Sequence, residues 1–115
     1  MIRRYLFLPA AMLVIGSSAA APQSVEARLA ECRKQIDDTD QQIVKLLNRR
    51  ARIVARVGAI KKDAHLPIAA PDRERKVLDH IAQVGSAGPL PPEALRRIYA
   101  NIIQEMRGWE ASLRQ

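Results

Sequence analysis

The feature that most restricts the fold is a long helical periodicity that starts at Val25. Apolar or weakly polar residues recur there every three or four positions, at Val25, Leu29, Cys32, Ile36, Thr39, Ile43, Leu46, Ile53, Val57, Ile60 and Ala64. This heptad pattern predicts one helix of about 40 residues, and Ser24 is suited to cap its start. Such a helix would be about 60 Å long, which is more than one small domain can cover. We therefore expect an intertwined antiparallel homodimer in which a second copy pairs with it.

The rest of the chain predicts two shorter helices. A loop is expected over residues 63–70, and Pro71 is well placed as the first residue of a helix that ends at Gly85. Residues 91–93 open a third helix whose apolar positions continue to Leu113. Aromatic residues make up only 3% of the chain, which argues against an aromatic-rich β-sandwich. The predicted fold is all-α: a three-helix protomer with a long first helix.

The N-terminus has the pattern of a secretory signal peptide, predicted over residues 1–21. Arg3 and Arg4 precede an apolar stretch over residues 5–15, and small residues follow over 16–21. The stretch is well short of the roughly 20 residues that span a bilayer. We expect an exported, periplasmic or secreted protein that is not held in a membrane after cleavage. In the mature domain, residues 22–115, the loss of the two arginines would lower the net charge from +7 to +5.

The residue inventory excludes several kinds of chemistry. The single cysteine, Cys32, allows no disulfide within the chain, and the isolated His65 and His80 suggest no metal cluster. The sequence therefore predicts neither a metal nor a cofactor. The positive charge favours an anionic partner. Nucleic acid is disfavoured because acidic residues are interleaved with the basic ones and aromatic side chains for stacking are few.

Charged residues occupy positions where the helical pattern expects apolar ones. Arg50 falls on the heptad between Leu46 and Ile53. Lys61 follows eleven residues later, which at 100° per residue places both side chains on one face, about 16 Å apart. Together they could bracket a small dianion. Glu110 lies on the apolar face of the third helix, so the alternative is a buried Arg50–Glu110 ion pair with Lys61 extending to solvent.

Arg33 has a geometric restriction of its own. It precedes Arg50 by 17 residues, so the two lie about 25 Å apart and on different faces of one helix. They could meet only across an antiparallel dimer. Otherwise Arg33 is a solvated surface charge.

Several runs of the sequence resemble the all-helical AroQ class of chorismate mutases. These are residues 33–40, 46–50, 57–61, 67–68, 72–75 and 98–105, which occur in the order and at the spacings of that family. The resemblance implies a dimer of three-helix protomers with two shared active sites. It also implies an isomerase of aromatic amino acid biosynthesis that converts chorismate to prephenate by a Claisen rearrangement, without a cofactor.

The resemblance assigns roles to particular residues. Arg50, Lys61 and Arg33 of the partner subunit would hold the two carboxylates of chorismate. Lys61 and Glu110 would contact the ether oxygen of the breaking bond. Glu74 would contact the substrate hydroxyl, and Arg73 would help to orient the site.

Two positions depart from the family pattern. Ala70 stands where many members have Asp, and Met106 stands where a small polar residue often contacts a carboxylate. These departures would fit a non-catalytic helical dimer that binds a ligand. A second alternative is an isochorismate-pyruvate lyase, which shares the fold and has similar Arg and Lys positions. The run 72–75 favours the mutase over the lyase.

Overall fold

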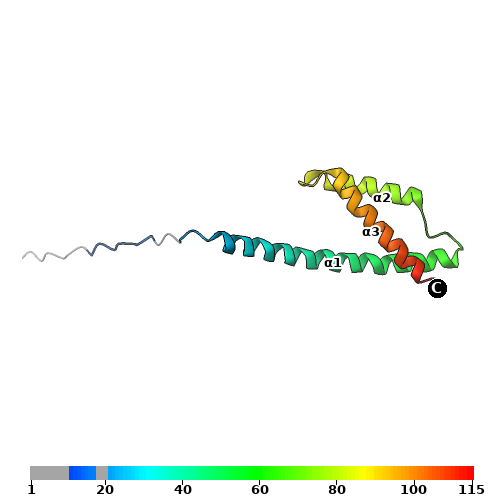
Figure 1. The fold of residues 1–115 in the computed structure, drawn as a ribbon, viewed down its shortest axis with the longest axis horizontal. Coiled ribbons are helices and arrows are strands. Elements are labelled where there is room, and N and C mark those ends of the chain that lie inside the picture. The colour runs from blue at the N-terminus through cyan, green and yellow to red at the C-terminus, as the bar shows by residue number, and fades with distance from the viewer. Residues whose placement is uncertain (1–10, 18–20) are drawn as a thin grey trace, which may run out of the picture.

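A computed structural model describes residues 11–17 and 21–115 of the chain. Three α-helices occur in this part, namely α1 (Val25–Asp63), α2 (Pro71–Val84) and α3 (Pro92–Ser112), with a short 3-10 turn η1 (Gly85–Ala87) after α2 (Figure 1). The residues described contain no β-strand. The predicted all-α fold with a long first helix is thus confirmed, and the helix ends lie within one or two residues of the predicted ones.

Local sequence signals explain where the helices begin. The Ser24 side-chain oxygen accepts a hydrogen bond from the backbone N–H of Ala27 at 3.1 Å, so Ser24 is the N-cap of α1. α2 and α3 each begin at a proline, Pro71 and Pro92, whose fixed φ suits the first turn and whose missing N–H has no role there.

The three helices make one crossing and one hairpin. α3 turns back from the end of α2 and descends across the C-terminal part of α1 (Figure 1). α1 and α2 each pack against α3, but among the residues described they make no packed interface with each other. α3 therefore holds α1 and α2 apart. Among the residues described, few are buried, and they lie where the helices meet: Gly58, Ile103 and Glu110.

The N-terminal half of α1 extends beyond the rest of the protomer (Figure 1). Every residue from Val25 to Leu46 is exposed in a single copy. These include the apolar residues of the heptad pattern, for example Ile36 at 57% and Leu46 at 61%. An apolar stripe of this length is costly to leave in water. The dimer predicted from the sequence would cover it, and it stays a prediction.

The predicted signal peptide lies partly outside the residues described, which omit 1–10 and 18–20. Residues 11–17 form neither helix nor strand. Within the described ranges, none of the helices combines the length and the apolar character needed to cross a bilayer.

Two helical glycines provide a test of the α1–α3 crossing. A Cβ at Gly58 would lie 2.9 Å from Glu110 Cγ, whereas a Cβ at Gly108 meets nothing within 4 Å. Either Gly→Ala change gains about 1 kcal/mol of helix propensity. We expect Gly108→Ala to raise the free energy of unfolding by about that amount. The free energy of unfolding of Gly58→Ala should be about 1 to 3 kcal/mol lower than that of Gly108→Ala, because the added Cβ is crowded against Glu110.

The two variants are to be compared by thermal unfolding at one protein concentration, followed by circular dichroism. An equal gain in stability for both would show that α3 does not pack closely on α1 at Gly58.

Candidate active site

A cleft of about 270 Å³ lies where all three helices approach one another. Its walls come from α1, the loop before α2, α2 itself and α3. The lining residues are Arg50, Ile53, Val54, Val57, Lys61, Ile68, Ala70, Arg73, Glu74, Val77, Ile103, Met106, Arg107 and Glu110. A small organic molecule would meet apolar walls with a few charged groups directed into them, as is usual in binding sites for small metabolites.

Helical spacing places these side chains in the cleft. On α1, Arg50 and Lys61 line it together, as their common face predicted. On α3, the lining residues fall at positions 103, 106, 107 and 110, which are three or four residues apart and lie on one side of the helix.

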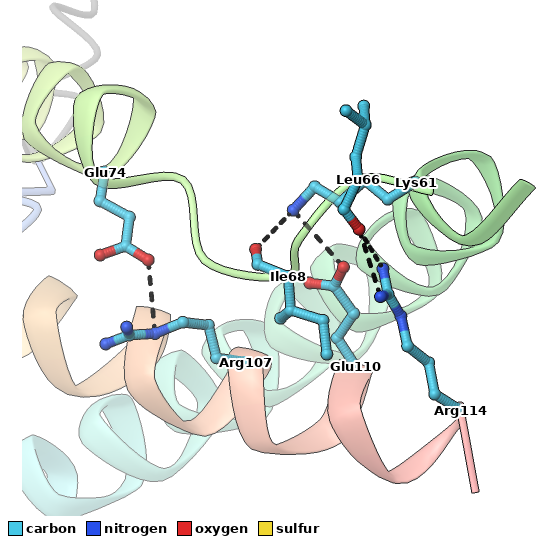
Figure 2. A network of polar contacts seen from close by, with 7 residues as sticks. All are labelled: Lys61, Leu66, Ile68, Glu74, Arg107, Glu110 and Arg114. Atoms are coloured by element: carbon cyan, nitrogen blue, oxygen red, sulfur yellow. Dashed lines mark hydrogen bonds and ion pairs between the residues drawn. The ribbon is translucent and has the colours of Figure 1, made fainter. Parts of the chain in front are cut away.

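Lys61 and Glu110 form an ion pair at the bottom of the site. Lys61 Nζ lies 3.4 Å from Glu110 Oε1 and donates a hydrogen bond of 2.7 Å to the backbone carbonyl of Ile68 (Figure 2). The Glu110 side chain is only 5% exposed and that of Lys61 19%. Glu110 Oε1 accepts no hydrogen bond from the residues described. Since buried carboxylate oxygens normally have a donor, the hydrogen-bonding capacity of this atom, whose charged neighbour is Lys61 Nζ, is not filled within the described residues.

This pair corrects one of the alternatives drawn from the sequence. That alternative paired Glu110 with Arg50 and directed Lys61 to solvent. The structure pairs Glu110 with Lys61, which is mostly buried. The reason is that α3 crosses α1 at Gly58, three residues from Lys61 and eight from Arg50. Arg50 lines the cleft and forms no ion pair with the residues described.

Glu74 lies on the α2 side of the cleft, where Arg107 holds it. Arg107 Nε lies 3.3 Å from Glu74 Oε1, and both side chains are partly exposed (Figure 2). Arg73, the residue before Glu74, also lines the cleft. Sequence reasoning did not single out Arg107. The available signal was its position three residues before Glu110, which places the two on neighbouring parts of the α3 surface.

The loop between α1 and α2 is fixed from the C-terminus. Both terminal guanidinium nitrogens of Arg114 donate to the backbone carbonyl of Leu66 at 3.3 Å (Figure 2). In the same loop His65 has a positive φ of 57°, a conformation that most side chains disfavour. This loop presents the Ile68 carbonyl to Lys61, so Arg114 supports the site indirectly. Arg114 was also missed from the sequence.

The remaining predicted residues are separated into two groups. Ala70 and Met106 line the cleft and make part of its wall apolar. Arg33 is exposed on the free half of α1 and does not line the cleft of its own protomer. This agrees with the expectation that Arg33 and Arg50 cannot meet on one helix.

No metal-binding cluster of three or more histidine, cysteine or acidic side chains occurs in the part of the chain that the structure describes. Cys32 is free and exposed on α1.

Comparison with known proteins gives a consistent result. The family model for chorismate mutase type II matches residues 32–111. The chain is 40% identical over 89 residues to a bifunctional chorismate mutase/prephenate dehydratase of Aquifex aeolicus (strain VF5), covering 75% of this chain and 25% of that protein. It is 39% identical over 57 residues to a chorismate mutase of Methanocaldococcus jannaschii, covering 50% and 58%. The chain spans only about a quarter of the length of the bifunctional relative.

Among solved structures, the fold is similar to that of a chorismate mutase (form II) from Thermus thermophilus. The TM-score is 0.70 at 28% identity, over 73% of this chain and 94% of that one. Every residue that we assigned to the site, from Arg33 to Glu110, falls within the range matched by the family model. The chain therefore belongs to the chorismate mutase type II family.

Proposed function

We propose that this protein is a chorismate mutase that converts chorismate to prephenate. The observation that carries the proposal is the buried Lys61–Glu110 pair in a cleft that also contains Arg50. A cleft with fixed cations suits a small dicarboxylate, and family membership supports chorismate as that substrate.

The reaction places few demands on the protein. In one step the ether C–O bond breaks and a C–C bond forms within the same molecule, so no atom is gained or lost. The protein must hold the substrate in a compact conformation with the reacting carbons close together. It must also supply positive charge or hydrogen-bond donors where the breaking bond gathers negative charge on oxygen.

Lys61 is suited to the ether oxygen. Its ammonium group has three donor hydrogens, and only one of them is used in the hydrogen bond to Ile68. The Ile68 carbonyl and Glu110 hold Nζ on two sides, so the lysine is already oriented before substrate binds. Pre-oriented donors of this kind lower the barrier because they need no reorganisation during the reaction.

Glu110 is suited to a second hydrogen bond to the same oxygen. A carboxylate cannot donate a hydrogen bond, so Glu110 would act in its protonated form. Its Oε1 atom, buried and without a hydrogen bond in the residues described, supports this role.

The proposed active unit is a homodimer with Arg33 donated across the subunits. The exposed apolar residues between Val25 and Leu46 support this arrangement, because a second α1 would remove them from water. In an antiparallel pair, the start of one α1 approaches the middle of the other, where Arg50 lines the cleft. We also propose that residues 1–21 are a signal peptide and that the mature enzyme is exported.

Replacing Lys61 tests the electrostatic mechanism. We expect Lys61→Ala to lower kcat for chorismate by about a hundredfold or more, because one donor to the developing charge is lost. The neighbouring Lys62 is exposed on α1 and does not line the cleft, so Lys62→Ala is the matched control and should retain full activity. A Lys61→Ala rate within a few fold of the unmodified protein would contradict the assignment. Faster pyruvate release from isochorismate than prephenate formation from chorismate would favour the lyase instead.

Replacing Glu110 tests the second hydrogen bond. Glu110→Gln keeps the size of the side chain and has an N–H donor, so kcat for chorismate should stay within a few fold of the unmodified protein. Glu110→Ala removes the donor and should lower kcat by about a hundredfold. Glu105 lies exposed on α3, so Glu105→Ala is the matched control and should retain full activity. Full activity in Glu110→Ala would exclude a hydrogen bond from Glu110 to the ether oxygen.

Mixing variants tests the shared site. We expect Arg33→Ala and Lys61→Ala each to be nearly inactive alone. Random exchange of subunits puts both changes into one site of each mixed dimer and leaves its other site intact. Half of the dimers should be mixed, and each of these has one intact site of two, so about a quarter of all sites should be active. Chorismate consumption after co-refolding measures this. If the mixture stays inactive, Arg33 does not act in the partner's cleft.

A further inference from the structure

Arg107 connects α3 to α2 at the cleft through Glu74. The Arg107 Nε to Glu74 Oε1 distance is 3.3 Å, and both residues line the cleft that contains Lys61 and Glu110 (Figure 2). We propose that Arg107 is a positioning residue that holds the Glu74 carboxylate toward the substrate hydroxyl. This inference deepens the proposed mutase function and depends on it.

The surroundings of Glu74 show why it needs a partner. Ala70, the residue before α2, and Val77 on α2 line the cleft on either side of Glu74, and Met106 lines it from α3. None of these side chains can donate a hydrogen bond to a carboxylate. Among the residues described, Arg107 is the one ion-pair partner that Glu74 has.

The partial exposure of Glu74 also supports a positioning role. The Glu74 side chain is 26% exposed, so solvent reaches it and its rotamers are not fixed by packing alone. Glutamate loses substantial side-chain entropy when it is held in one conformation. A contact from α3 fixes this conformation before substrate binds, as pre-organisation requires.

A double-mutant cycle tests whether Arg107 acts through Glu74. We expect Arg107→Gln to lower kcat/KM for chorismate by about tenfold or more, because a displaced contact group costs rate even when the fold is kept. In a Glu74→Gln background the same change should have almost no further effect. Arg96→Gln is the matched control: Arg96 is also on α3 and pairs with Asp79 and Glu93, outside the cleft, so this variant should retain full activity.

A substrate analogue without the ring hydroxyl gives an independent readout. Its turnover should be the same in the unmodified protein and in Arg107→Gln, since the group that Glu74 contacts is missing. A purely structural role of Arg107 would lower the turnover of both substrates equally. Circular dichroism of Arg107→Gln checks that the helical content is kept.

The outcomes separate this inference from the proposed function. An unmodified protein that forms no prephenate would overturn both. An active protein whose Arg107→Gln variant matches it would overturn only the role of Arg107. A loss that persists undiminished in the Glu74→Gln background, or with the analogue, would mean that Arg107 acts through the fold or on the substrate directly, and would also overturn the positioning role.

Discussion

The crossing of α3 over α1 at Gly58 determines the geometry of the whole site. Because Gly58 has no side chain, the Glu110 side chain lies directly against the α1 backbone, close enough that a Cβ at Gly58 would be 2.9 Å from Glu110 Cγ. From this position Glu110 reaches Lys61, one turn further along α1. Lys61 in turn binds the carbonyl of Ile68 and so connects the crossing to the loop that leads into α2. One close helix contact therefore orients Glu110 on α3, Lys61 on α1 and the Ile68 carbonyl in the loop before α2.

The second constraint is the length of α1. Its C-terminal part packs on α3, but the residues from Val25 to Leu46 are exposed in one protomer. The described part of the protomer buries few residues, which is little for a stable domain of this size. A second copy that covered the apolar stripe would add the missing buried surface. The same pairing would bring Arg33 toward the cleft of the partner subunit, whereas Arg33 does not line the cleft of its own protomer. Stability and function would then depend on one interface.

Local signals were sufficient to predict the helices but not their contacts. Ser24, Pro71 and Gly85 mark helix ends because capping and backbone conformation are decided by a few neighbouring residues. The common face of Arg50 and Lys61 follows from helix geometry alone.

The partner of Glu110 could not be predicted in this way, since it depends on where α3 crosses α1. Arg107 was missed for the same reason: its role comes from Glu74 on another helix, and arginine at a partly exposed position is usual on any helix surface.

The cleft contains two kinds of positively charged side chain. Lys61 and Arg107 are each paired with a carboxylate, whereas Arg50 and Arg73 line the cleft without an ion pair among the residues described. A carboxylate held by Arg107 can accept a hydrogen bond from a hydroxyl, Lys61 keeps N–H donors for an ether oxygen, and an unpaired arginine is available to an incoming carboxylate. In the proposed mutase, the cleft would thus recognise the charge of the substrate and its polar oxygens with different side chains.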